Sequence, residues 1–359
     1  MRPALPDAEA LMPYLRQIDA NAHYTNFGPL QKELLNRLIN IQTSLEDSKV
    51  TGLLTSSATQ GLELAISALD LPQNSKILVP ALTFIATATA VQRCGHIPVV
   101  ADVDPETWML SPNTVNLGVN DHEIKAVIPV ATFGMPQDSQ NWSNWQKSNG
   151  IPVIIDAASS FGAQQSAEGI TVVFSLHATK ALSTAEGGLV ITRDPQLSDR
   201  LQALTNFGIG RINSGVGTNA KLSEYHAAIG LAHLDIWPAQ INRRRDLLKF
   251  YQDSLNSEKN HRLRFQKNTG LFAPSVFNIR LCNAKIRSNL EAAFEHQGIQ
   301  TRRWYQPLLQ NQPILKGVMR LGLTPTSDEL ADTLIGLPFF IDMTQDQVKQ
   351  IRDIVLSMN

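Results

Sequence analysis

The feature that most constrains the fold is the alternation of short apolar runs with helical segments through the first two thirds of the chain. The runs are rich in β-branched residues and occupy residues 76–80, 97–103, 126–130, 151–156, 171–176 and 188–192. Strands that alternate with helices are typical of a parallel sheet, because each helix carries the chain back to the edge from which it started. The sequence therefore predicts an α/β domain with a mostly parallel sheet, in which the closely spaced later strands allow some antiparallel pairs.

From about residue 220 the pattern changes from alternating to mainly helical. A helical segment at 223–237 precedes a basic helix through Arg243, Arg244, Arg245 and Tyr251, which looks like a connector. Beyond it follow one strand-like run and two helical runs, at 276–281, 289–298 and 344–358. We therefore predict a large domain over residues 1–235 and a small C-terminal α+β domain over 236–359.

The composition argues against a nucleic-acid partner. The chain has 359 residues, of which 43% are hydrophobic, and its 31 basic side chains nearly balance 32 acidic ones. Proteins that bind polyanions usually carry a basic excess, which is missing here. We expect a water-soluble globular protein with a sizeable core.

The cysteines and the N-terminus indicate a cytoplasmic protein. Cys94 and Cys282 are far apart in the sequence, so neither a disulfide framework nor a metal site is predicted. Residues 1–15 lack the continuous apolar core of a secretion signal, and no run of about 18 apolar residues occurs. We expect the protein to be neither secreted nor membrane-spanning.

Lys180 is the first candidate catalytic residue. It lies in a polar stretch between two predicted strands and ahead of a Gly-Gly pair. A lysine amine can form a Schiff base with an aldehyde cofactor if its pKa is low enough to leave some of it neutral. The alternative interpretation is an ordinary surface lysine in a loop.

Asp156 is the second candidate, because it ends the apolar run Ile-Pro-Val-Ile-Ile. Its carboxylate should emerge at the carboxyl end of a buried strand, where ligands of open α/β sheets gather. A carboxylate there can keep a pyridine nitrogen protonated, which makes the ring an electron sink. A cap on the following helix is the structural alternative.

A third candidate is the turn at Ser57, Ala58 and Thr59, which leads from a strand-like run into a helix at 58–69. Apolar residues recur through that helix at i, i+3, i+4 and i+7, which predicts one buried face. The N–H groups at a helix start can bind phosphate. Ordinary N-capping explains the same residues.

The order of these features resembles one known family. The chain is similar to the DegT/DnrJ/EryC1/StrS sugar aminotransferases, which have the fold type I of aspartate aminotransferase and use pyridoxal 5′-phosphate (PLP). The resemblance covers nearly the whole chain and is carried by SSATQGLELAISAL, LVPALTFIATATAVQRCGHIPVVADVD, VIPVATFGMP, IIDAASSFGA, FSLHATKALSTAEGGLVIT, GTNAKLSEYHAAIGLAHL and LPFFIDMT. It implies a large domain with a mostly parallel seven-stranded sheet and a small C-terminal domain.

The resemblance assigns the cofactor contacts residue by residue. Lys180 falls on the Schiff-base lysine, and Asp156 falls on the partner of the pyridine nitrogen. The phosphate contacts fall on Ser57, Ala58, Thr59 and Ser175. Ala58 stands where the family usually has glycine, a change that costs little if only the backbone N–H is needed.

Further cofactor contacts are implied by the same resemblance. Phe84 falls on the aromatic that stacks over the cofactor ring, with a core phenylalanine as the alternative. Ser159 stands where the family commonly has a glutamine that binds the cofactor hydroxyl. Asn219 matches an asparagine that reaches the phosphate site of the neighbouring subunit, which implies a homodimer with shared active sites.

Substrate contacts are implied at both ends of the chain. Tyr24 and Asn26 match a loop that approaches the sugar. Arg302, Arg303 and Trp304 could bind a diphosphate or carboxylate and stack on a base, or they could form a solvated basic edge with a core tryptophan. Leu309 stands where the family often has histidine.

His177 is the last candidate residue. His177 could contact the cofactor or the substrate, although a hydrogen-bonded structural histidine is the alternative.

The implied reaction moves an amino group from L-glutamate to a nucleotide-linked keto-sugar. The preferred acceptor is dTDP-4-keto-6-deoxyglucose, aminated at C4, in a pathway such as O-antigen lipopolysaccharide biosynthesis. A 3-keto isomer and a non-catalytic PLP-binding regulator stay open. A dinucleotide-dependent dehydrogenase lacks its Gly-x-Gly-x-x-Gly motif.

Overall fold

The computed structural model describes residues 2–42, 50–116, 118–119, 122–210, 215–255, 263–267 and 272–357. Its main sheet is formed by β1 (Thr51–Thr55), β2 (Lys76–Pro80), β3 (Ile97–Ala101), β4 (Ile124–Val127), β5 (Ile154–Asp156), β6 (Thr171–Ser175), β7 (Gly188–Thr192) and the short β10 (Met319–Arg320). Two ladders, β1-β7-β6-β5 and β10-β3-β2-β4, meet through parallel bridges between Val127 and Val153 and between Val130 and Asp156. Seven strands and the short β10 therefore form one continuous sheet.

The sheet is parallel except at β7, which runs antiparallel to both β1 and β6. The predicted mostly parallel α/β sheet is confirmed. The exception has a local cause, because residues 176–187 join β6 to β7 without a helix that could carry the chain back across the sheet. That connection contains Lys180, so the break in parallel order and the candidate lysine lie in the same segment.

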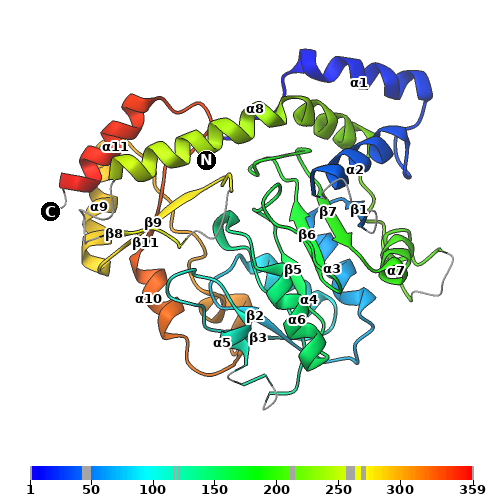
Figure 1. The fold of residues 1–359 in the computed structure, drawn as a ribbon, viewed down its shortest axis with the longest axis horizontal. Coiled ribbons are helices and arrows are strands. Elements are labelled where there is room, and N and C mark those ends of the chain that lie inside the picture. The colour runs from blue at the N-terminus through cyan, green and yellow to red at the C-terminus, as the bar shows by residue number, and fades with distance from the viewer. Residues whose placement is uncertain are drawn as a thin grey trace.

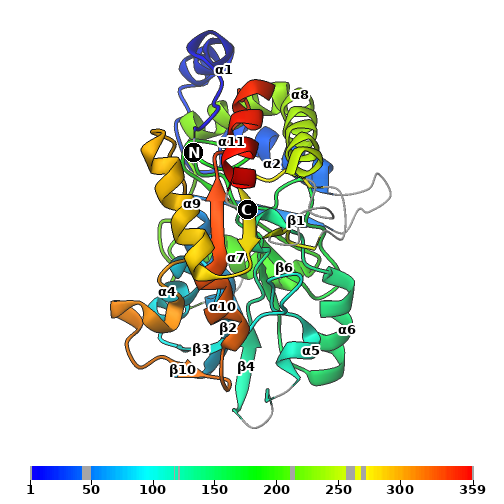
Figure 2. The same cartoon turned by 90° about the vertical axis from the view of Figure 1, so that its left-hand side faces the viewer.

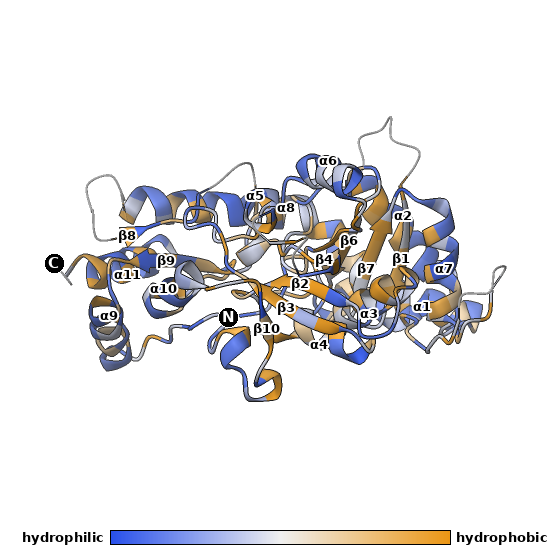
Figure 3. Cartoon of the chain, turned by 90° about the horizontal axis from the view of Figure 1, so that it is seen from below, coloured by the Kyte–Doolittle hydropathy of each residue, from blue (hydrophilic) through white to orange (hydrophobic). Residues whose placement is uncertain are grey.

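Helices cover both faces of the main sheet. They are α3 (Ala58–Ala68), α4 (Ile85–Arg93), α5 (Pro112–Val115), α6 (Ser139–Asn149) and α7 (Pro195–Thr205). Figure 3 shows apolar strands at the centre and polar residues on the outer surfaces of the helices. Every residue of β6 and β7 is buried, as expected for strands that pack against helices on both faces.

Three further helices pack together, and one of them, α2, packs against β1 (Figure 1): α1 (Ala8–Asn21), α2 (Pro29–Gln42) and α8 (Glu224–Leu255). Glu224 is buried and accepts hydrogen bonds from the backbone N–H of Leu30 at 2.9 Å and of Gln31 at 2.8 Å. A carboxylate at a helix N-terminus satisfies N–H groups that have no partner within the helix. This contact fixes the start of α2, and with it the 22–28 loop, against α8.

A small antiparallel sheet forms beyond α8, in the order β11-β9-β8. Its strands are β8 (Leu263–Arg264), β9 (Phe277–Leu281) and β11 (Leu334–Leu337), and its helices are α9 (Ala284–His296), α10 (Pro325–Thr333) and α11 (Gln345–Ser357). Figure 2 shows α9 and α11 beside β9 and β11. The run predicted as a strand at 276–281 is β9, and the predicted terminal helix is α11.

The division at residue 235 stays a proposal, because two segments cross it. The first is α8, which continues through Pro238 as one helix of 32 residues where the sequence suggested two consecutive segments. In the second, the chain returns to the main sheet after α9, where Leu309 and Leu315 join its core and β10 pairs with β3. None of the described helices is long and apolar enough to cross a membrane.

Candidate active site

A cavity of about 430 Å³ opens at the carboxyl ends of the main-sheet strands. The predicted site residues that line it are Ser57, Ala58, Thr59, Phe84, Asp156, Ser159, Ser175, His177, Lys180 and Trp304. They follow β1, β2, β5 and β6, or belong to the 176–187 loop and the segment after α9. The chain thus brings together residues that are up to about 250 positions apart, at the edge where α/β sheets bind ligands.

Lys180 lies on a loop that is closed by its own backbone. Leu176 N–H donates to Gly187 O at 2.9 Å, and Thr184 N–H donates to Leu176 O at 2.8 Å. The Lys180 amine donates to Ser159 Oγ at 2.9 Å. Lys180 is partly buried, and this burial lowers its pKa, although the nearby Asp156 carboxylate opposes the shift. A larger neutral fraction makes the amine a better nucleophile.

Asp156 is buried at the end of β5 with both carboxylate oxygens hydrogen-bonded. Oδ2 accepts from Thr87 Oγ1 at 2.7 Å, and Oδ1 accepts from Ala158 N–H at 3.1 Å. Burial raises the pKa of Asp156, whereas these two donors and the charge of Lys180 lower it. A carboxylate in this setting favours a cationic partner inside the pocket, because an opposite charge offsets the desolvation of the buried anion.

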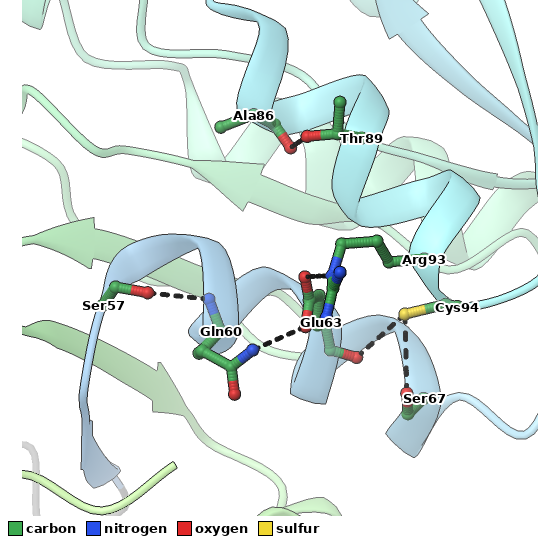
Figure 4. A network of polar contacts seen from close by, with 8 residues as sticks. All are labelled: Ser57, Gln60, Glu63, Ser67, Ala86, Thr89, Arg93 and Cys94. Carbon is green, nitrogen blue, oxygen red and sulfur yellow. Dashed lines mark hydrogen bonds and ion pairs between the residues drawn. The ribbon is translucent and has the colours of Figure 1, made fainter. Parts of the chain in front are cut away.

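The start of α3 supplies an anion-binding position. Ser57 is the N-cap residue, and its Oγ accepts from Gln60 N–H at 3.2 Å. Figure 4 shows how this turn connects to α4: Gln60 Nε2 donates to Glu63, and Glu63 pairs with Arg93 of α4 at 2.6 Å. The N–H groups of Ala58 and Thr59 have no carbonyl partner within the helix, and both residues line the cavity.

Close packing behind this turn requires a glycine on β7. A Cβ atom built at Gly188 would lie 2.6 Å from the carbonyl oxygen of Ser57, a separation that backbone atoms do not tolerate. The Gly-Gly pair that follows the Lys180 loop therefore allows β7 to approach the start of α3. In this way β7 connects the lysine loop to the start of α3.

Aromatic side chains form one wall of the cavity. Phe84 keeps 60% of its surface exposed although it is large and apolar, so a flat face is free to contact a ligand. Phe133, which follows β4, stacks on Tyr305, which follows α9. Their ring centroids lie 4.9 Å apart, and their planes differ by 6°. Both residues have φ near +60°, a conformation that is uncommon for bulky side chains and gathers at functional sites.

Thr87, Phe133 and Tyr305 were missed by sequence reasoning. Thr87 lies one turn after Phe84 on α4, so the spacing could have indicated that it shares the cavity side. No comparable signal exists for Phe133 and Tyr305, because their left-handed backbone and mutual stacking depend on segments far apart in the sequence.

His177 belongs to the loop structure as well as to the cavity. Its Nδ1 lies 2.9 Å from Thr179 Oγ1 and accepts from Thr179 N–H at 3.3 Å. Its Nε2 lies 3.5 Å from Glu186 Oε1. The histidine therefore braces the turn that precedes Lys180, as the structural alternative suggested, and its ring edge still lines the pocket.

Four predicted site residues lie outside this cavity. Tyr24 is half exposed and stacks on Tyr225 at 6.4 Å, and Asn26 lies in the same exposed loop. Asn219 is exposed and forms a backbone bridge with Asn206. Arg302 is exposed and bridges to Gly336 through its backbone. One chain alone does not bring these four side chains to Lys180.

The architecture and the cavity at its strand ends are those of PLP enzymes of fold type I. The chain belongs to the DegT/DnrJ/EryC1/StrS aminotransferase family, a model of which matches residues 7–356. The resemblance seen in the sequence is thereby confirmed.

Solved structures with the same fold cover almost the entire chain. A putative PLP-dependent aminotransferase from Bacillus cereus ATCC 10987 is 24% identical, with a TM-score of 0.91 over 99% of this chain and 98% of its own. DesI, solved in the presence of its TDP-sugar product, is 28% identical, with a TM-score of 0.88 over 99% of this chain and 92% of its own. DesV from S. venezuelae is 23% identical, with a TM-score of 0.85 over 99% and 98%.

PLP is the cofactor of this protein, and the cavity has the chemical groups to bind it. The amine of Lys180 can take an aldehyde, the carboxylate of Asp156 can take a protonated ring nitrogen, and the start of α3 can take a phosphate. Phe84 offers an apolar face to the ring. These groups come from separate elements, and each suits a different part of the cofactor.

Proposed function

We propose that this protein transfers an amino group from L-glutamate to a nucleotide-linked keto-sugar. The preferred acceptor is dTDP-4-keto-6-deoxyglucose, which would give dTDP-4-amino-4,6-dideoxyglucose. The observation that carries the proposal is the partly buried Lys180 amine in one cavity with the buried Asp156 carboxylate. The likeness to DesI, which was solved with a TDP-sugar product, supports the choice of acceptor.

Lys180 and Asp156 have complementary roles in the proposed reaction. The bound cofactor supplies a ring that accepts the electron pair released at the α-carbon of the amino acid. Lys180 holds the cofactor and, once displaced, its neutral amine removes the α-proton of glutamate. Asp156 keeps a proton on the ring nitrogen, because its buried negative charge stabilises the cationic form. Ser159 Oγ accepts a hydrogen bond from this amine.

The remaining contacts are assigned by position. Ser57, Ala58, Thr59 and Ser175 bind the cofactor phosphate, and Phe84 stacks on its ring. In this proposal Ser159 also binds the cofactor hydroxyl. Trp304 lines the cavity and would contact the substrate, while His177 contributes its exposed ring edge.

A homodimer with shared active sites would complete the pocket. Asn219 lies on an exposed segment with Phe207 and Val216, which expose 56% and 97% of their surfaces. Apolar side chains this exposed are common at interfaces between subunits. In the proposed dimer Asn219 reaches the partner's phosphate site, and Tyr24, Asn26 and Arg302 contact the sugar nucleotide. We place the protein in the cytoplasm, in the synthesis of deoxyamino sugars such as those of O-antigen lipopolysaccharide.

Absorption spectroscopy tests both half-reactions. The purified protein is loaded with PLP, then given L-glutamate, then dTDP-4-keto-6-deoxyglucose. We expect glutamate to bleach the visible band of the cofactor and the sugar to restore it, with NMR showing nitrogen at C4 of the product. Restoration by the 3-keto isomer alone would reassign the acceptor. A band that glutamate leaves unchanged would contradict an aminotransferase that uses this donor and favour a PLP-binding regulator.

Thr87→Val should weaken the reaction through Asp156. The valine has the shape of threonine but cannot donate to Oδ2, so the pKa of Asp156 rises further and the ionised fraction falls at a given pH. We expect kcat to fall about tenfold, and the acid limb of the kcat profile to move to higher pH. Thr87→Ser keeps the hydroxyl and is expected to behave like the unchanged protein. Equal profiles for the serine and valine variants would contradict this role.

A further inference from the structure

Behind the loop that presents Lys180 lies a buried histidine that the proposed reaction does not use. His233 is on α8 and exposes only 1% of its surface. Its Nδ1 lies 3.1 Å from the backbone N of Ser183, three residues after Lys180. A side chain of α8 therefore contacts the backbone of the lysine loop at Ser183.

The contacts of His233 fit a neutral ring with its proton on Nε2. When Nδ1 accepts the Ser183 N–H, the ring proton sits on Nε2, which donates to Gln240 Oε1 at 3.0 Å. Ser183 continues the chain of contacts, because its Oγ accepts from Ala185 N–H at 2.8 Å. Ala185 has φ of +67°, so the turn that Ser183 supports is conformationally unfavourable without such contacts.

The surroundings of the ring oppose its protonation. Burial lowers the pKa of His233, and the positive charge of Arg244, three turns further along α8, lowers it in addition. The contacts of the ring with Gln240 and with the Ser183 carbonyl oxygen act in the opposite direction, because both can accept a proton from the charged ring. Asp235 is the nearest acidic residue along α8, but it lies about 200° around the helix from His233, where Tyr14 of α1 and Arg37 of α2 bind it.

The Arg244 charge is not neutralised within the described part of the chain. Its side chain is buried, its Nε has no hydrogen-bond partner, and burial lowers its pKa to about 10. The face of α2 that packs near Gly230, one turn before His233, is apolar and contributes Leu34. The charge that lowers the pKa of His233 is therefore that of the Arg244 cation.

We propose that His233 is a positioning residue for Lys180: its neutral imidazole anchors the 176–187 loop through Ser183 and releases that N–H on protonation. A protonated Nδ1 is a donor and cannot accept the Ser183 N–H, but it can turn to the Ser183 carbonyl oxygen 3.2 Å away. The exchange of partners leaves the N–H without an acceptor. The inference rests on the proposed function only in that the loop presents the reactive lysine.

Amide hydrogen exchange of the full-length protein tests the anchor directly. The protection factor of the Ser183 amide is measured across pH, by mass spectrometry with fragmentation and correction for the intrinsic rate. We expect protection at neutral pH and a loss of about tenfold as the ring becomes protonated, at a pH below the ordinary histidine pKa. Protection that stays constant through acidification, while the fold persists, would overturn the proposal.

Two variants separate anchoring from packing. His233→Asn offers an amide oxygen near the position of Nδ1 and does not titrate, so Ser183 should stay protected at both pH values. His233→Leu fills the space without an acceptor and should lose about tenfold in protection already at neutral pH. His96→Asn is the matched control, because His96 is also buried with a lowered pKa but lies between α4 and β3. A leucine variant as protected as the unchanged protein would overturn the proposal.

The same samples distinguish this inference from the proposed function. The visible band of PLP bound at Lys180 should persist in His233→Asn at acid pH and decline in the unchanged protein together with Ser183 protection. If Ser183 follows His233 as expected but no amino transfer occurs with any sugar, the proposed function fails and the anchor stands. If amino transfer proceeds while Ser183 protection is independent of residue 233, the anchor is wrong and the function stands.

Discussion

Replacing Lys180 with alanine is expected to reduce turnover by about 10⁴-fold or more, because one change removes both the cofactor's attachment and the base at the α-carbon. The phosphate position at the start of α3 does not depend on this side chain, so PLP should still bind, without the absorption band of the lysine adduct. Stopped-flow absorption with glutamate and equilibrium dialysis of PLP check the two statements. Appreciable remaining transamination would remove Lys180 from its proposed role.

Lys147→Ala is the control for this experiment. Lys147 forms a surface ion pair with Glu168 and lies on α6, outside the cavity. Exposed ion pairs of this kind contribute little to stability, so both activity and folding should remain near those of the unchanged protein.

Lys180→Ala also removes the positive charge that lowers the pKa of Asp156. The Asp156 carboxyl should therefore take up a proton more readily in the Lys180→Ala variant.

Asp156→Asn is expected to lower kcat by about 10²–10³-fold with little loss of PLP binding. The amide keeps the size of the carboxylate and can still bond to Thr87 and the Ala158 N–H, so the change is mainly one of charge. The neutral side chain cannot hold the ring nitrogen in its protonated form. Single-turnover rates with glutamate give the size of the effect, and a rate within threefold of the unchanged protein would contradict the role.

Two controls show whether the Asp156 effect is chemical. Burial raises the pKa of Asp156, so its ionised form costs free energy in the folded protein, and removing the charge should not lower the melting temperature of the cofactor-free protein. Asp138→Asn changes another aspartate that follows the sheet, but Asp138 caps α6 away from Lys180. Asparagine caps helices as well as aspartate, so this variant should retain full activity.

The main sheet could be predicted from the sequence because its strands are buried on both faces and therefore appear as nearly continuous apolar runs. The same runs located Asp156 at a strand end and Lys180 between two strands, and the structure brings both to one cavity. These signals are local, since each needs only the residues on either side.

What the sequence did not indicate depends on contacts between distant segments. The stacking of Phe133 on Tyr305 requires two left-handed residues that are 172 positions apart. The bond from Thr87 to Asp156 joins a helix to a strand 69 residues later. The continuity of α8 through Pro238 was also missed, because proline usually ends or bends a helical pattern.

The return of the chain to β3 through β10 has a mechanical consequence. Two bodies joined by a single linker can rotate about any axis, whereas two bodies joined at three separate places have far less freedom to rotate. The chain crosses between the main sheet and the small sheet along α8 and again before and after β10. Trp304 and Tyr305 lie just ahead of that return. The part of the cavity that these two residues line is thus linked by the chain both to the small sheet and to the main sheet.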